Sequence, residues 1–347
     1  MTARRVTLLF AIGIVVTVLA VWVSGRSQSA RDSIAGTKVL PGLESSVNDV
    51  TQIRITKAGR TQTTLEREAT DWVVAQRDYP ADSGKLRKLL LDLGSLQAVE
   101  RKTAQPRNYA VLGVQDVTQP DATGARIDIV SAGKTWSLIV GNSVDDNDCY
   151  VRVVAAAQSL LASPLILVDA DPKLWLDPNV LDIAQNRISE IDEQPVKAPA
   201  FSVSRDKSTE ADFAVHGVPR GRELSAADAA DTMGSALSAL TLTDAIKAAA
   251  PPAGSALSHA VFKTFDGLEV DISGYKQAAD DYIEVSARGT DRSAAATEAL
   301  EINSRVQGWE YDIPDYRYEE IFQPLEGLLK PLPAKKPSGG AHGKPRG

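Results

Sequence analysis

Two groups of closely spaced acidic residues are the first candidates for chemistry, because carboxylates bind hard cations and act as general acids and bases. The first group is Asp145-Asp146-Asn147-Asp148. An EF-hand calcium loop also needs a glycine at its sixth position and a glutamate at its twelfth, and both are missing here. The second group, Asp169, Asp171 and Asp177, surrounds two prolines. We therefore expect a solvated hairpin tip for the first group and helix caps or turns for the second.

Nucleophiles and metal ligands of other kinds are few. The chain has one cysteine, Cys149, and three histidines, His216, His259 and His342. His216 and His259 lie beside expected strands without a nearby serine or cysteine nucleophile, which favours ordinary surface or core roles. Acidic neighbours raise the pKa of a thiol, so we expect Cys149 to be an unreactive, part-buried strand residue. A single cysteine also excludes intrachain disulfides and Cys-based structural zinc sites.

Motifs of the common enzyme classes are absent from the sequence. It contains no G-x-x-x-x-G-K-[ST], G-x-G-x-x-G, G-x-S-x-G or H-E-x-x-H pattern. Trp72, Trp136, Trp175 and Trp309 are expected to anchor hydrophobic cores, although sugar-binding surfaces use tryptophans too. We therefore predict no catalytic, cofactor-binding or metal-binding residues, no cofactor, and no enzyme activity.

Charge is distributed unevenly along the 347 residues. Residues 1–26 and 330–347 carry only basic charges, whereas the 303 residues between them hold 30 basic and 45 acidic side chains. An acidic body repels the phosphate backbone of nucleic acids. We therefore expect no nucleic-acid binding.

An uninterrupted apolar run from Val6 to Val23 follows Arg4 and Arg5. At about 1.5 Å per residue it would span roughly 27 Å, near the thickness of a bilayer core. The run is longer than the 7–15 apolar residues usual in a signal peptide, so we expect an uncleaved signal-anchor helix over 6–23. A cleavable signal peptide, a twin-arginine export signal and a buried core helix are the alternatives.

Orientation in the membrane does not follow from the flanking charges alone, because Arg26 and Arg31 come soon after the run. Long domains translocate largely regardless of their charge. We expect a single-pass protein of a bacterial inner membrane, with residues 1–5 in the cytoplasm and the body on the periplasmic side.

Strand-like and helix-like segments recur in the same order in two halves of the body. In the first half, strands are expected at 50–55, 61–67, 71–74, 126–130, 135–140, 150–154 and 165–169, with a helix over 83–97 capped by Asp82. In the second half, strands are expected at 201–204, 212–215, 260–264, 268–272 and 282–285, with a capping-box helix from Ser225 to Leu240. A helical passage over 172–185 should join the halves.

Specific positions match across the halves, with an offset that falls from 141 to 132 residues. The matches are 71–74 with 212–215, Gly133 with Gly267, Gly141 with Gly274, and 150–153 with 282–285. This pattern predicts an internal repeat; two stretches that merely resemble each other are the alternative.

The expected fold class is α+β, with an N-terminal transmembrane helix followed by two similar lobes of antiparallel sheet, each with a packed helix. The expected domains are a linker at 24–49, a first lobe at 50–188, a second lobe at 189–325 and a disordered basic tail at 326–347.

Several short motifs carry a resemblance to a known family. They are Trp72-Val73-Val74, Tyr79-Pro80-Ala81-Asp82, the leucines Leu89, Leu90, Leu93 and Leu96, Leu174-Trp175-Leu176-Asp177, Arg187-Ile188, and Gly308-Trp309-Glu310-Tyr311-Asp312-Ile313-Pro314. Over roughly residues 50–320 the chain resembles the bacterial domain of unknown function 4340 family. Members look like single-span envelope proteins, often encoded beside auxiliary subunits of gliding-motility-type ABC transporters. The resemblance implies an accessory role and supplies no catalytic residues.

Two hypotheses about function follow. The first is a membrane-anchored extracytoplasmic accessory or interaction protein, bound to the bilayer through Val6–Val23, that works with a membrane-protein partner such as a transporter auxiliary subunit or with an envelope complex. The second is an envelope enzyme or ligand-binding protein that acts on glycans in the cleft between the lobes. Paired carboxylates in a deep pocket would favour the enzyme, whereas a shallow groove or an exposed sheet edge would favour the interaction protein.

Overall fold

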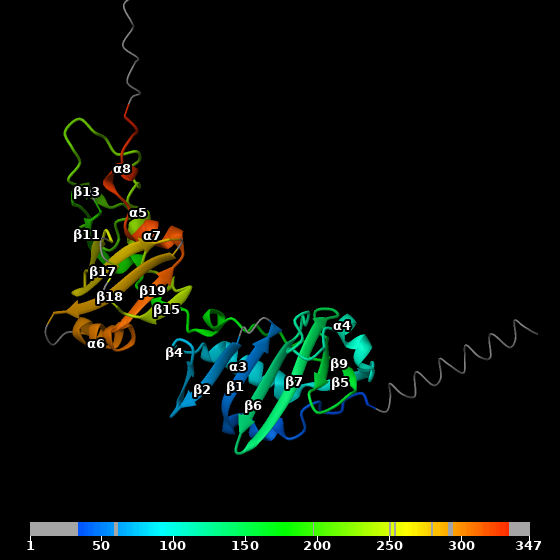
Figure 1. Ribbon diagram of the computed structural model, residues 1–347. Coiled ribbons are helices and arrows are strands. Elements are labelled where there is room, and N and C mark those ends of the chain that lie inside the picture. Colours follow the sequence, from blue (N-terminus) through cyan, green and yellow to red (C-terminus); the bar gives the residue numbers. More distant parts are fainter. Residues whose placement is uncertain are drawn as a thin grey trace, which may run out of the picture. The chain divides into compact units, whose positions relative to one another are not determined.

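The computed structural model of the chain describes residues 34–58, 62–196, 198–249, 251–252, 255–278, 280–290 and 294–332 (Figure 1). The chain divides into two compact units between Asp177 and Pro178, which we call the first lobe and the second lobe. The expected membrane span, Val6–Val23, lies outside the described residues. Within the described residues, no helix is both long and apolar enough to cross a membrane.

The first lobe is built on a nine-stranded antiparallel sheet with the strand order β4-β3-β2-β1-β6-β7-β8-β9-β5. The strands are β1 (Val50–Lys57), β2 (Gln62–Glu68), β3 (Asp71–Val74), β4 (Tyr79–Pro80), β5 (Gln97–Arg101), β6 (Ala125–Ser131), β7 (Lys134–Ser143), β8 (Cys149–Val153) and β9 (Ser159–Ser163). Along β6, buried residues alternate with half-buried ones, so one face of the sheet forms the core.

Helices of the first lobe are α2 (Leu43–Ser46), α3 (Ser83–Ser95) and α4 (Tyr109–Leu112), with 3-10 turns η1 (Val47–Asp49), η3 (Pro106–Asn108) and η4 (Pro172–Trp175). The expected cap of α3 is confirmed, because Asp82 accepts a hydrogen bond from the backbone of Lys85, and the leucines predicted at helical spacing are buried. The folded part begins earlier than expected, since α2 lies within the expected linker and Leu43 is fully buried.

The second lobe is built on an eight-stranded antiparallel sheet with the order β13-β12-β11-β16-β17-β18-β19-β15 and a two-stranded sheet β10-β14. The strands are β10 (Asn179–Leu181), β11 (Ile188–Gln194), β12 (Phe201–Ser204), β13 (Ala214–His216), β14 (Leu240–Thr241), β15 (Asp244–Lys247), β16 (Ser258–Thr264), β17 (Leu268–Gln277), β18 (Asp280–Gly289) and β19 (Trp309–Ile313). The helices are α5 (Asp231–Gly234), α6 (Ala294–Val306), α7 (Asp315–Ile321) and α8 (Leu325–Leu328), with the 3-10 turn η5 (Gln185–Arg187).

The strand predicted at 165–169 is wrong. The strand of this region is β9, which pairs with both β8 and β5 and ends at Ser163. Pro164 follows directly and has no backbone N–H to donate to a ladder, so the chain leaves the sheet there.

Two predicted helices are also wrong. The passage over 172–185 contains only η4 before β10 begins, because Pro178 cannot continue a helix and disfavours helical geometry in Asp177. The helix from Ser225 to Leu240 shrinks to the single turn α5. The Ser225 N–H donates to the Leu328 carbonyl at 2.8 Å, so tertiary contacts rather than a capping box fix this segment.

Several elements of the second lobe were not predicted from the sequence. They are β10, β11, β14, β15, β19, α6 and α7, of which α6 packs against β18 (Figure 1). The expected disordered tail begins too early, since α8 covers Leu325–Leu328 and Leu329 forms a bridge with Leu224. Residues 333–347 of that tail lie outside the described residues.

The strand orders of the two lobes correspond element by element, apart from the additional edge strand β4. Leu65 lies opposite Val74, and Val203 lies opposite Val215, which confirms the offset of 141 between 71–74 and 212–215. The match of Gly141 with Gly274 is wrong by one residue. Gly274 pairs with Ser258 and Ile283, as Val140 pairs with Ala125 and Val151.

The main helices do not occupy equivalent places in the two lobes, contrary to expectation. In the first lobe, α3 connects β4 with β5, whereas in the second lobe α6 connects β18 with β19. The repeat is therefore a repeat of strand order.

Candidate functional site

Asp145, Asp169 and Asp171 accept backbone hydrogen bonds in turns or at a cap, whereas Asp177 lies in the connection between η4 and β10. Asp145 accepts hydrogen bonds from the backbones of Asn147 and Asp148, at 2.8 and 2.9 Å, in the exposed β7–β8 turn. Asp171 caps η4 through the Lys173 N–H at 3.0 Å. Asp169 accepts from the Asp171 N–H and lies 3.2 Å from the Lys57 ammonium. These contacts confirm the hairpin-tip and cap interpretation for the groups that they involve.

Cys149 lies on β8 and is fully buried. Burial raises the pKa of its thiol, and the nearby charge of Asp148 raises it further. A buried thiol that holds its proton is a poor nucleophile, in agreement with the expected strand position.

The two histidines of the described chain each contact a different partner. His216 Nε2 lies 2.8 Å from the Ser204 hydroxyl, so the expectation that no serine lies near this histidine is wrong. His259 Nε2 lies 2.8 Å from an Asp271 carboxylate oxygen. Both histidines line an open pocket of about 470 Å³. Three strand spacings separate β13 from β16, roughly 14 Å in all, so the two pairs do not form one catalytic set.

The tryptophans fall into two classes. Trp136 and Trp175 are buried, and their indole N–H groups donate to the carbonyls of Pro41 and Asp169 at 3.1 and 2.9 Å. Trp72 and Trp309 are half-buried, and each lines a surface pocket of its own lobe. The expected core role therefore holds fully for only two of the four.

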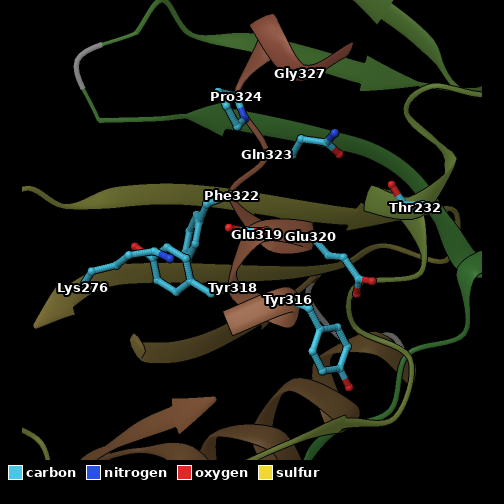
Figure 2. Close-up of a pocket in the computed structure, with 10 residues that line it drawn as sticks. All are labelled: Thr232, Lys276, Tyr316, Tyr318, Glu319, Glu320, Phe322, Gln323, Pro324 and Gly327. Atoms are coloured by element: carbon cyan, nitrogen blue, oxygen red, sulfur yellow. The ribbon is translucent and has the colours of Figure 1, made fainter. Parts of the chain in front are cut away.

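A groove on the second lobe, which we call the α7 groove, has a volume of about 530 Å³ (Figure 2). It is formed by α7, the turn that follows, the end of β17, and one residue each of α5 and α8. Its lining residues are Thr232, Lys276, Tyr316, Tyr318, Glu319, Glu320, Phe322, Gln323, Pro324 and Gly327.

Two aromatic rings form the apolar part of the groove. Tyr318 and Phe322 lie with ring centroids 4.7 Å apart, and Figure 2 shows them side by side next to Lys276. Gly274 on β17 makes this packing possible, because a Cβ atom there would lie 2.4 Å from Phe322 Cε2. Burial raises the pKa of the Tyr318 phenol.

Charged groups surround these rings. The Lys276 ammonium lies 2.6 Å from Asp315 and 3.3 Å from the buried carboxylate of Asp281. Burial and a shared hydrogen bond with Asp315 raise the pKa of Asp281. Glu320 pairs with Arg317 at 3.0 Å, whereas Glu319 makes no ion pair with any described residue. Tyr316 is 59% exposed, so the groove offers an accessible aromatic ring beside an accessible carboxylate.

One further carboxyl of the second lobe is unusual. Glu193 is only 2% exposed, and neither of its oxygens has a hydrogen-bond partner among the described residues. Burial raises its pKa to about 9, and the charge of Asp192 adds to the effect. Alternation along β11 places its side chain with Ile191, on the core face of the sheet. It is therefore a protonated core residue near neutral pH.

None of the residues that build the α7 groove was a candidate from the sequence. They come from positions 232, 276 and 316–327, which only the tertiary fold brings together. The single sequence signal is the run Asp315-Tyr316-Arg317-Tyr318-Glu319-Glu320, directly after the Trp309–Pro314 motif. In the described part of the chain, no group of three or more His, Cys, Asp or Glu side chains could hold a metal ion.

Comparison with protein families gives one match. The family described as "Domain of unknown function (DUF4340)" matches residues 72–257, more than half of the chain. The chain belongs to this family, as the motifs indicated. No curated protein and no solved structure matches it. The matched range includes parts of both lobes and ends before α7.

Proposed function

We propose that this member of the DUF4340 family is a membrane-anchored, extracytoplasmic accessory protein that binds a membrane-protein partner through its second lobe and is not an enzyme. The α7 groove is the observation that carries the proposal, because it joins a buried aromatic pair to an exposed tyrosine and an exposed carboxylate. Open grooves of mixed apolar and polar character suit the recognition of polypeptide segments. Asp145 and Asp171, first considered for catalysis, accept backbone hydrogen bonds of a turn and a cap, and Cys149 is fully buried, which supports the proposal.

The family resemblance supports a partner in a transporter or another envelope complex, and the apolar run Val6–Val23 supports a membrane anchor. The protein should remain in the membrane fraction after an alkaline wash. A reporter that is active only after export should be active when it is fused after residue 330. Lysines in place of Val15 and Val16 should block insertion, since each central charge costs roughly 2.5–3.5 kcal/mol. A cytoplasmic reporter signal would contradict this location.

A complementation experiment separates the interaction protein from the enzyme. In a strain that lacks the gene, the double variant Tyr316→Ala/Glu319→Lys should fail to restore the phenotype. The matched double variant Leu300→Ala/Glu301→Lys, on the exposed face of α6, should restore it fully. Equal membrane levels of both variants control for folding.

The same assay tests the glycan-directed enzyme or ligand-binding protein, which is the alternative. Substitutions of His216, His259, Cys149, Asp145 or Asp171 should each leave function within a few-fold of wild type. Loss of a general acid or base lowers activity by about 10²-fold or more. If one of these single variants shows such a loss while the groove variant is active, the enzyme hypothesis replaces ours.

A further inference from the structure

The last residues of the chain have a composition that grooves lined by aromatic and acidic side chains recognise. Residues 333–347 contain three prolines and four basic side chains, and they contain no acidic side chain. Proline-rich segments favour the polyproline II conformation, which loses little entropy on binding and docks in aromatic-lined grooves. Lysine and arginine side chains also stack on aromatic faces.

The α7 groove has the complementary chemistry. Glu319 and Glu320 line it together with Lys276. Glu320 is paired with Arg317, so Glu319 is the carboxylate that a basic segment would meet. The tyrosines of the groove already accept cations, because the Arg317 guanidinium lies 5.5 Å from the Tyr316 ring and the Lys276 ammonium lies 4.9 Å from the Tyr318 ring. Pro324 and Tyr316 are exposed, so a proline of a bound segment could pack against either.

The fold anchors the start of this basic segment near the groove. Pro324 and Gly327 line the groove, and the chain reaches Lys330 three residues later. Lys330 is fixed by an ion pair with Glu223 at 2.7 Å, and Leu329 is fixed by its bridge to Leu224. Fifteen further residues can extend up to roughly 50 Å. A tether of this length gives an effective concentration on the order of millimolar, so a weak intrinsic affinity is enough for occupancy.

We propose that residues 333–347 bind in the α7 groove of their own chain and compete there with the partner segment. This inference rests on the proposed function of the groove and adds a regulation to it. The partner must displace the basic segment, so removal of that segment increases partner binding.

In the experiment, a benzophenone amino acid replaces Tyr316 in the full-length protein in detergent. An aromatic ring therefore remains at this position. Mass spectrometry after illumination should find a link within one chain between position 316 and residues 333–347. The double variant Lys335→Glu/Lys336→Glu should lose at least three-quarters of this link. The same probe at Leu300, an exposed position on α6, should give none.

A peptide of residues 333–347 provides the second measurement. It should bind a variant that ends at residue 332, and Glu319→Lys in that variant should weaken binding about 10-fold. Absence of the link and of peptide binding would overturn the inference, as would a link that joins light and isotope-labelled copies. If position 316 links to a membrane protein in cells while the peptide does not bind, the inference fails and the proposed function stands. If the peptide binds while no membrane protein is linked even after removal of residues 333–347, the proposed function fails.

Discussion

The two lobes share a strand order. They differ on the face of the sheet that lies opposite the core face. In the first lobe, the connection between β5 and β6 carries Tyr109 and Val114, which pack with Ile139 of β7 in an apolar cluster. In the second lobe, the connection between β15 and β16 spans only residues 248–257, and Ser273 occupies the ladder position of Ile139.

The two lobes also differ in their charge. Residues 34–177 hold 18 acidic and 16 basic side chains, whereas residues 178–332 hold 26 acidic and 14 basic side chains. Core ladder positions therefore maintain the common topology, while the remaining surface is free to diverge. We propose partner binding by the second lobe because acidic charge and the α7 groove occur together there.

The largest expected loss of stability comes from substitutions at equivalent core positions of the two lobes. Ile53 of β1 and Ile191 of β11 are fully buried and pair with Ile129 and Phe262 of the next strands. Replacement of either isoleucine by alanine should lower the free energy of unfolding of its own lobe by about 2–5 kcal/mol. Hydrogen exchange by mass spectrometry should show the loss of protection in that lobe. A loss of protection confined to the other lobe would contradict the proposed equivalence of the two isoleucine positions.

Substitution of Gly274, a position where the two lobes differ, should give the next largest loss of stability. Gly274→Val installs the residue that the first lobe has at this ladder position, Val140, but its side chain would collide with Phe322. We expect a loss of about 1–3 kcal/mol in thermal or denaturant unfolding. Ser273→Val on the opposite face of the strand is the control and should change stability by no more than about 0.5 kcal/mol. Equal effects of both variants would show that the aromatic pair does not pack on this glycine.

Glu193 occupies the ladder position of Ile55, since each follows its matched isoleucine by two residues. The native state binds an extra proton between the unfolded pKa near 4.3 and the native pKa of about 9. Wild-type stability therefore falls as pH rises through this window. Glu193→Ile should remove that slope, which is about 1.4 kcal/mol per pH unit within the window, so its gain in stability should be smallest near pH 4 and largest at pH 8.

Denaturant titrations at pH 4, 6 and 8 measure this change. Gln194→Ile at the exposed end of the same strand is the control, because it adds the same side chain without removing a titratable group. A gain that is the same at all three pH values would show that Glu193 does not carry the linked proton.

The smallest expected change in stability comes from an exchange at Ser273. Ser273→Ile places the first-lobe residue at a half-buried position between His259 and Glu284 of the neighbouring strands, so stability should change by no more than about 0.5 kcal/mol. The reverse exchange, Ile139→Ser, removes a fully buried side chain from the first lobe and should cost about 2–4 kcal/mol. A large gain from Ser273→Ile would show that the second lobe has an apolar cover after all.

Elements whose own residues specify them could be predicted from the sequence. The alternating strands around Gly133 and Gly267 and the capped, leucine-rich α3 are of this kind. β11 was missed because Glu193 interrupts the apolar alternation at a core position. The helix expected after Ser225 has suitable residues, yet contacts with α8 override that local propensity.

The α7 groove could not be predicted, for a related reason. Its lining residues at 232, 276 and 316 are 44 and 40 positions apart in the sequence. The remaining lining residues come from α7, from α8 and from a turn without a motif. Long-range contacts of this kind leave no periodic signal in the sequence. The turn and cap roles of the aspartates were predictable because proline and aspartate act on the backbone within a few residues.

The central claim is that the α7 groove of the second lobe makes the contact with the partner. The most direct measurement is photo-crosslinking in the native cell, with the benzophenone amino acid at Tyr316 or at Val111, which is 76% exposed on α4 of the first lobe. We expect a membrane-protein adduct from position 316, stronger in the chain that ends at residue 332, and none from position 111. An adduct from position 111 with none from position 316 in either chain would contradict it.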